Sequence, residues 1–296
     1  MKVLNFGSLN IDHVYEVPHF LNPGETLSSN KYNSFPGGKG LNQSIAIAKA
    51  GTYVYHAGKI ASDSTQLLKI LQESGVDTTF LDTSGSTTGH AIIQVNQAGE
   101  NCILLYGGSN LEISEEYIDH VFDSLKEDCI LMLQNEISNL QYIMDRAKRQ
   151  DMKIAFNPSP IDDNLLQMDL SSVTWLILNE IEGAALSGTQ EPESVTKHLL
   201  QKYPNMRIIL TLGEKGAIYE DCYERYEQPI FPAKVKDTTA AGDTFTGYFI
   251  SEIASGSDIP RALELASKAA AIAVSREGAS SSIPSRQEVV NCKSIS

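Results

Sequence analysis

The segment 237–245, with the sequence DTTAAGDTF, places five small or hydroxylated residues between two acidic ones, ahead of an amphipathic helical pattern. Its small side chains at 240–242 would let the backbone N–H groups of a helix N-terminus approach an anion closely. Asp243 would lie in the first helical turn, where the helix dipole favours an ionised carboxylate. A carboxylate beside an anion hole could deprotonate an attacking hydroxyl, as phosphoryl transfer requires. Considered alone, the segment fits an ordinary N-capped helix equally well.

A second candidate site is the glycine-rich segment 36–43, PGGKGLNQ. Its three glycines allow close backbone approach or positive φ, while Lys39 and Asn42 supply donors and an acceptor for hydroxyl groups. This pattern suits a polyol held against the main chain. It matches neither the Walker A loop nor the G-x-G-x-x-G fingerprint, because Gln43 stands where the third glycine would be. A glycine turn that leads into a helix is the simpler alternative.

Polar residues also follow several apolar runs. Asn10 and Asp12 come at the C-terminal end of the first expected strand, where open α/β sheets bind ligands, and Glu136 follows a later strand in the same way. Asp12 could accept hydrogen bonds from two neighbouring sugar hydroxyls, although a turn-forming aspartate is the commoner explanation. Asn179 and Glu182 could arrange phosphate or water around a divalent cation, or could be solvated residues at a helix start.

The elements that must position these residues show an alternating pattern. The short apolar runs 129–135, 153–159, 175–180 and 207–213 are typical of buried parallel strands. Between the first two, the segment 139–150 carries an apolar stripe at helical spacing, as a βαβ crossover requires. The sequence therefore predicts an α/β fold with a mostly parallel central sheet.

Two stretches, at about 13–35 and 90–108, alternate as strands do and interrupt this pattern. Within the second, the runs 90–96 and 101–106 are joined by turn residues. We expect small antiparallel ribbons that form a lid near the site. The chain shows no internal repeat or linker, so residues 1–296 are expected to form one α/β domain with this lid.

Composition limits the partners. Hydrophobic residues make up 42% and charged residues 20%, and the net charge is −14 without a basic run, which argues against nucleic acid or an anionic membrane as the main partner. The N-terminal segment resembles neither a secretory signal nor a membrane span. The four cysteines are widely spaced without a C-x-x-C pair, which fits reduced thiols. We expect a cytoplasmic protein.

Taken together, the motifs resemble those of the ribokinase-like sugar kinases of the PfkB family. The matching segments are GSLNID at 7–12, GGKGLNQ at 37–43, NEIE at 179–182, TLGEKG at 211–216 and DTTAAGDTF at 237–245. They occur in the family's order and approximate spacing through nearly the whole chain. The Asn-Gln pair after GGKG looks more like the ribokinase branch than the phosphofructokinase branch.

The resemblance implies a mostly parallel sheet with helices on both faces and a small β-sheet lid. It also implies ATP-dependent phosphorylation of the primary hydroxyl of a pentose, with D-ribose as the first choice of substrate. It implies Mg²⁺ and activation by K⁺, and a homodimer formed through the lid. The implied catalytic residues are Asp243 as base with Ala240, Ala241 and Gly242 as the anion hole. The implied sugar-binding residues are Asn10, Asp12, Gly38, Lys39, Asn42, Glu136 and Asp243. The implied nucleotide-binding residues are Asn179, Glu182 (through Mg²⁺-bound water), Thr211, Gly213, Gly216 and Gly242. The implied K⁺ loop contains Asp237, Thr239, Ala273, Arg276, Gly278 and Ser282, partly through main-chain oxygens.

Several alternatives stay open. Tyr106 is expected on a lid strand that faces the sugar, and His90 replaces a small apolar residue usual in the family, so both leave the substrate uncertain. Deoxyribose, a nucleoside or a keto-sugar are the other substrates considered. A sugar-binding protein that has lost turnover would retain the fold without needing Asp243. A dinucleotide-dependent oxidoreductase is disfavoured because its fingerprint is missing.

Overall fold

The body of the protein is an α/β sheet. The computed structural model describes residues 1–292 and 295, and within them nine strands are ordered β13-β12-β11-β10-β9-β8-β1-β4-β5. Neighbours from β5 to β11 pair in parallel, and β12 and β13 add antiparallel pairings at one edge. The predicted α/β class with a mostly parallel sheet is therefore confirmed. The strands are β1 (Lys2–Phe6), β4 (Val54–Ala61), β5 (Leu81–Gly85), β8 (Cys129–Gln134), β9 (Lys153–Asn157), β10 (Val173–Asn179), β11 (Arg207–Thr211), β12 (Ala217–Glu220) and β13 (Arg225–Gln228).

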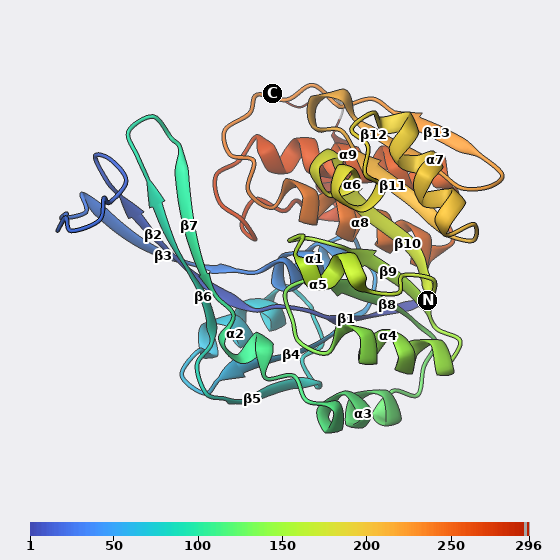
Figure 1. The fold of residues 1–296 in the computed structure, drawn as a ribbon, viewed down its shortest axis with the longest axis horizontal. Helices are drawn as coiled ribbons and strands as arrows, with labels where there is room; N and C mark the ends of the chain where they lie inside the picture. The colour runs from blue at the N-terminus through green and yellow to red at the C-terminus, as the bar shows by residue number, and fades with distance from the viewer. Residues whose placement is uncertain (293–294, 296) are drawn as a thin grey trace.

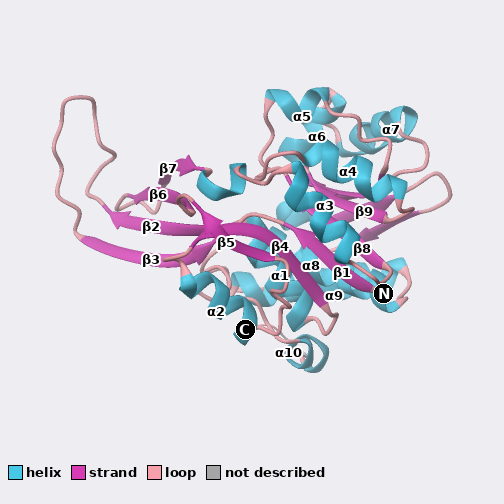
Figure 2. Cartoon of the chain, turned by 90° about the horizontal axis from the view of Figure 1, so that it is seen from below, coloured by secondary structure: helices cyan, strands magenta, loops and turns pink. Residues whose placement is uncertain are grey.

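Helices cover both faces of this sheet (Figure 2). One face carries α1 (Lys39–Lys49), α2 (Thr65–Glu73), α8 (Ala241–Ser255), α9 (Ile259–Val274) and α10 (Arg286–Asn291). The other carries α3 (Glu115–Ser124), α4 (Leu140–Arg149), α5 (Asp163–Gln167), α6 (Glu180–Ser187) and α7 (Pro192–Lys202). Two short 3₁₀ turns are η1 (Gly108–Leu111) and η2 (Gly213–Lys215). Among the described residues, no helix has both the length and the apolar character that crossing a membrane demands.

Each central strand is apolar on both sides, which is why it reads as a continuous hydrophobic run. Val3 and Ile130 pack into the cluster under α1 and α8, whereas their neighbours Leu4 and Leu131 pack into the cluster under α3 and α4. Because successive side chains of a strand point to opposite faces, one short segment contributes to two cores.

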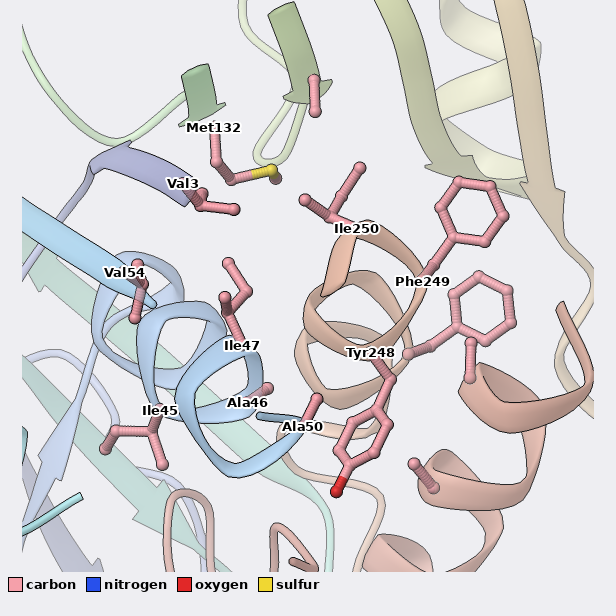
Figure 3. Packing of buried hydrophobic residues seen from close by; sticks show 14 of the residues in the cluster. Val3, Ile45, Ala46, Ile47, Ala50, Val54, Met132, Tyr248, Phe249 and Ile250 are labelled. Atoms are coloured by element: carbon pink, nitrogen blue, oxygen red, sulfur yellow. The ribbon is translucent and has the colours of Figure 1, made fainter. Parts of the chain in front are cut away.

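Helices α1 and α8 approach each other unusually closely. A Cβ added to Gly247 would lie 2.4 Å from the Cβ of Ala46, so only glycine fits at that contact. Figure 3 shows Ala46 of α1, and Ala50 that follows the helix, packed beside Tyr248 of α8. The two helices are therefore held together by buried packing.

The lid is a separate sheet that projects from the body (Figure 1), with the order β3-β2-β6-β7 within the described chain. Its strands are β2 (Asn10–Glu16), β3 (Lys31–Gly37), β6 (Gly89–Val95) and β7 (Asn101–Tyr106). The two hairpins are antiparallel, as expected, and they are joined by a parallel pairing of β2 with β6 that the sequence did not indicate. The first hairpin also extends beyond the expected 13–35, because the chain enters the lid directly after β1.

Candidate active site

The parallel strands end at one edge of the sheet, and the candidate residues gather there. Glu136 follows β8, Asn179 ends β10 and Thr211 ends β11. The N-termini of α1 and α8 also lie at this edge, as the cavity described below shows. Open α/β sheets bind ligands in such a place because loops and helix N-termini converge there.

Asn10 and Asp12 are placed differently from the prediction. They belong to the start of β2 in the lid, because β1 already ends at Phe6. The side chain of Asn10 is buried and its Oδ1 accepts a hydrogen bond from Nδ2 of Asn110 at 2.7 Å. Both predicted sugar-binding residues are thus carried by the lid rather than by the central sheet.

Asp243 is the third residue of α8 and only 8% exposed. Two consecutive amides of α1 hold its carboxylate: Asn42 Nδ2 donates to Oδ2 at 3.0 Å, and Gln43 Nε2 donates to Oδ1 at 2.9 Å. Ala240 is the N-cap, in the left-handed conformation with φ 59°. The N–H of Ala241 donates to the carbonyl of Thr238 at 3.3 Å. Because the first-turn N–H groups of a helix have no intrahelical acceptor, the N–H groups that follow in this turn can act as donors at the edge of the sheet.

Lys39 is the first residue of α1 and lies among acidic groups. Its backbone N–H donates to Oε2 of Glu136 at 3.1 Å, and the hydroxyl of Ser8 donates to the same carboxylate. Burial acts to lower the pKa of the Lys39 ammonium, but three carboxylates outweigh it, so the pKa lies above its ordinary value. Those carboxylates belong to Asp243, Glu136 and Glu182.

Burial also shifts the acids around Lys39. It raises the pKa of Asp12 to about 6, with a further contribution from the negative charge of Glu136. Burial likewise raises the pKa of Glu136, although Lys39 opposes this. Gly37 makes room for the Asp12 carboxylate, because a Cβ there would lie 2.1 Å from Asp12 Oδ2. The first glycine of the GGKG motif is therefore required by its close contact with Asp12.

Two cavities meet at the N-terminus of α8. The first, of about 260 Å³, contains Lys39, Glu182 and Asp243 in its lining. The second, of about 410 Å³, is lined mainly by apolar residues, among them Phe231 and Phe245. Five residues line both: Asn179, Thr211, Thr238, Ala241 and Gly242. The N-terminus of α8 thus lies between a small polar cavity and a larger apolar one.

Asn179 and Glu182 form a capping box at the start of α6. Asn179 Oδ1 accepts from the N–H of Glu182 at 2.9 Å, and Glu182 Oε2 accepts from the N–H of Asn179 at 2.9 Å. The helix-start alternative therefore describes their local role. Both residues also line the polar cavity, so the buried carboxylate of Glu182 forms part of its wall.

The predicted nucleotide turn has its own structural requirements. Gly213 and Gly216 have positive φ, and a Cβ on Gly216 would lie 2.1 Å from the carbonyl oxygen of Gln228. The N–H of Leu212 donates to the carbonyl of Gly216 at 2.8 Å, which closes the turn. Gly213 and Gly216 both line the apolar cavity.

The predicted cation loop is partly assembled around Asp237. Its Oδ1 accepts from the N–H and the hydroxyl of Thr239, and its Oδ2 accepts from the N–H of Gly278 at 3.0 Å. The structure thus brings together the segments before α8 and after α9. The remaining predicted members make other contacts: the N–H of Arg276 donates to the carbonyl of Ala273, the guanidinium of Arg276 pairs with Glu288, and the hydroxyl of Ser282 donates to the carbonyl of Ala279.

Comparison with known proteins agrees with this geometry. The sequence profile of the pfkB family carbohydrate kinases matches residues 1–286. The chain belongs to the pfkB carbohydrate kinase family. The predicted family and the predicted sugar kinase class of enzyme are both confirmed.

Individual relatives of this pfkB kinase cover almost the whole chain. A ribokinase from Haemophilus influenzae is 35% identical over 294 residues, covering 96% of this chain and 95% of the relative. Ribokinase from Cryptococcus neoformans var. grubii serotype A in complex with ADP superimposes with a TM-score of 0.86 at 32% identity, over 98% of both chains. Arabidopsis thaliana ribokinase complexed with ribose and ATP superimposes with a TM-score of 0.84 at 27% identity, over 98% of this chain and 97% of that one.

Sequence reasoning missed several polar residues of the pfkB kinase site. Ser8 and Asn110 hold Glu136 and Asn10, as described above, and Gln43 holds Asp243. Gln43 was part of a quoted motif, but its partners lie more than ninety residues away, so its role had no local signal. Further cavity-lining residues missed are Asn157, Ser159, Thr238 and Thr246.

The lid register places His90 and Tyr106 on the same face of the lid. Asp12 is paired with Ala91, whereas His90 is paired with Ile11 and with Tyr106. Because the face alternates with each residue, His90 and Tyr106 lie on the opposite face of the lid from Asp12. Their rings contact each other at a centroid distance of 5.1 Å.

Proposed function

We propose that this chain transfers the γ-phosphoryl group of ATP to the primary hydroxyl of D-ribose, giving ribose 5-phosphate and ADP. The observation that carries the proposal is the meeting of a polar and an apolar cavity at the N-terminus of α8, where Asp243 lines the polar cavity next to the shared residues Ala241 and Gly242. A pentose fits the first and a nucleotide the second, so the acceptor hydroxyl and the terminal phosphate would meet beside that carboxylate. The full-length similarity to proteins named ribokinase supports ribose as the sugar.

The sugar would be held where the polar cavity meets the base of the lid. Lys39 and Asp243 line that cavity, whereas Asn10, Asp12, Gly38, Asn42 and Glu136 lie outside its lining. Asp12 and Glu136 offer carboxylate acceptors to hydroxyls, and Lys39 offers an ammonium donor among them. Asn42 contributes an amide whose Oδ1 is buried without a hydrogen-bond partner in the described residues. This oxygen can accept a hydrogen bond from a sugar hydroxyl. Asn10 and the backbone at Gly38 complete the proposed sugar set.

In the proposed reaction, Asp243 accepts the proton of the sugar's primary hydroxyl. The oxygen then bonds to the γ-phosphorus while the bond between that phosphorus and the β–γ bridging oxygen breaks, and ADP leaves. The backbone donors at Ala240, Ala241 and Gly242 stabilise the charge on the transferred group. Asn42 and Gln43 keep the base oriented, because each donates to a different carboxylate oxygen.

The nucleotide would lie along the apolar cavity, with its phosphates at the shared residues. We place the base near Phe231 and the phosphates near Asn179 and Thr211. Glu182 suits Mg²⁺, which proteins commonly hold through one or two carboxylates together with substrate phosphates. When bound, Mg²⁺ would neutralise phosphate charge during transfer.

Potassium would bind in the loop built around Asp237. The Asp237 carboxylate and the Thr239 hydroxyl are oxygen donors that fit a hard monovalent cation, and main-chain carbonyls of the loop would complete the set. The guanidinium of Arg276 is engaged by Glu288, so Arg276 would contribute only its carbonyl oxygen. A cation there would be expected to stiffen the loop that leads into the anion hole.

We also propose a homodimer formed through the lid and a cytoplasmic location. The face of the lid that bears Asp12 carries exposed apolar side chains, including Phe35, Ile103 and Leu105. Such a surface is typical of an interface. The free thiols of Cys102, Cys129 and Cys222 support a reducing compartment.

A substrate panel tests the proposed activity. The purified enzyme is assayed for ADP release with ribose, deoxyribose, a nucleoside and a keto-sugar, in the presence of Mg²⁺ and K⁺. We expect ribose to give the highest kcat/KM. Another substrate with a higher kcat/KM would replace ribose, and sugar binding without ADP release would show that the chain has lost turnover.

A further inference from the structure

Buried amides connect the base to the interior of the sheet. Gln43, which is 0% exposed, donates from Nε2 to Asp243 Oδ1 at 2.9 Å and to Asn157 Oδ1 at 3.3 Å. An amide can offer either its oxygen or its nitrogen to a neighbour. Only the nitrogen can donate to a carboxylate, so the orientation of the Gln43 amide decides whether it attracts or repels Asp243.

Gln134, at the end of β8, sets that orientation. It is fully buried, and its Nε2 donates to Oε1 of Gln43 at 2.7 Å. With its oxygen occupied by this donor, Gln43 must present its nitrogen to Asp243. Within the described residues Gln134 forms hydrogen bonds with Asn5 and Gln43 but none with Asp243, so it acts on the base only through Gln43.

The orientation of Gln134 is set in turn by Asn5 of β1. Nε2 of Gln134 also donates to Asn5 Oδ1 at 3.0 Å, while Asn5 Nδ2 donates to the carbonyl of Gly40 at 2.9 Å and to Ser44 Oγ at 2.7 Å. A backbone carbonyl can only accept, so the series begins at a group whose polarity cannot reverse. Asn5, Gln134 and Gln43 therefore form a directional amide relay.

The surroundings leave the relay little freedom to rearrange. A Cβ on Gly7 would lie 2.7 Å from Gln134 Oε1 and 2.6 Å from the Cα of Gly40, so backbone packs directly against the amides. Gln134 Oε1 is itself buried without a hydrogen-bond partner in the described chain. Leaving a buried oxygen unpaired is unfavourable, and the arrangement accepts it while using both N–H groups of Gln134 along the relay.

We propose that this amide relay fixes the orientation of the catalytic base, with Gln43 as a positioning residue and Gln134 acting through it. The inference rests on the proposed role of Asp243 in phosphoryl transfer and extends it to residues that touch neither sugar nor nucleotide. Misplacing a reacting group by about 1 Å can lower turnover about 100-fold, which makes orientation of the carboxylate worth a dedicated network.

The test uses Gln43→Met, Gln134→Met and the double variant in the full chain, because methionine fills a similar volume without an amide. We expect Gln43→Met to lower kcat about 10- to 100-fold while KM for ATP and ribose stays within about threefold. Gln134→Met should lower kcat in the same direction but less. The double variant should be no worse than Gln43→Met, because Gln134 acts through that residue.

Thr52→Val is the matched control. Thr52 hydrogen-bonds Ser251 in another buried contact between the α1 region and α8, with Oγ atoms 2.7 Å apart and away from the cavities. It should lower the melting temperature and leave kcat unchanged. Melting temperatures of all variants separate loss of fold from loss of turnover.

Three results would overturn the relay: wild-type kcat in folded Gln43→Met, kcat losses that multiply in the double variant, or a loss confined to KM. Should Gln43→Met fail to fold, Gln134→Met decides alone, and wild-type kcat in it rejects the relay. Failure of the proposed function appears separately, as absent ribose turnover in the wild type or as full turnover in Asp243→Asn.

Discussion

The ionisation of Asp12 should control sugar affinity in the physiological pH range. As an ionised carboxylate it can accept hydrogen bonds from two sugar hydroxyls, whereas the protonated acid loses part of this capacity. Burial and the charge of Glu136 raise its pKa to about 6, compared with an ordinary value of 3.8. Sugar binding should therefore weaken on moderate acidification, at a pH where an exposed aspartate would still be fully ionised.

The size of the effect follows from that pKa. At pH 8 nearly all of Asp12 is ionised, while at pH 5 roughly one molecule in eleven is, so KM for ribose should rise about tenfold between these values. The same shift destabilises the sugar-free protein above pH 6, because the folded state then holds a buried charge. A difference near 2 between the folded and ordinary pKa corresponds to about 3 kcal/mol at most.

The expected change in sugar affinity is measured as KM for ribose in steady-state kinetics between pH 5 and 8, at constant K⁺ and saturating MgATP. The expected change in stability is measured as the free energy of unfolding of the sugar-free wild type and of Asp12→Asn, by chemical denaturation at pH 8. We expect the variant to be more stable and to bind ribose poorly. A flat KM across this range, or a variant less stable than the wild type at pH 8, would refute the reasoning.

Four further predictions can be checked independently. Asp243→Asn should lower kcat about 100-fold or more while calorimetry finds unchanged ADP affinity, and near-normal turnover would remove Asp243 from its role. Replacing K⁺ with Na⁺ should depress turnover, and equal rates would argue against the Asp237 loop. Burial lowers the pKa of His56 from 6.5 to about 4, so between these pH values the unfolded chain binds more protons than the folded one. The free energy of unfolding should therefore fall by about 3 kcal/mol as the pH drops from 6.5 to 4. Urea titrations of the wild type and of His56→Gln measure this loss, and identical pH slopes for the two proteins would contradict it. Leu105→Glu should shift a dimer to monomer in light scattering, whereas an unchanged mass would place the interface elsewhere.

Sequence reasoning succeeded where the signal is local. The run 129–135 is apolar on both sides because it is buried by helices on two faces, and the small residues at 240–242 directly reveal a helix start that can approach an anion. Both signals depend only on neighbouring residues, so they can be seen without the fold.

The missed features depend on partners that are distant in the chain. The parallel pairing of β2 with β6 is determined by where each strand leaves the body, and the face of His90 follows from that register. A shift of one residue would reverse it. The role of Gln43 likewise depends on Gln134, whose position beside it is set by the order of strands in the sheet.

Strand β2 is an interior strand of the lid and also carries Asp12. Swinging the lid outward would therefore carry Asp12 away from Glu136 and Lys39, so the proposed sugar pocket would lose a binding residue as it is uncovered. The element that covers the sugar would therefore also be one that binds it. An enzyme with an open lid would be unable to retain its sugar, and a bound sugar would stabilise the closed lid.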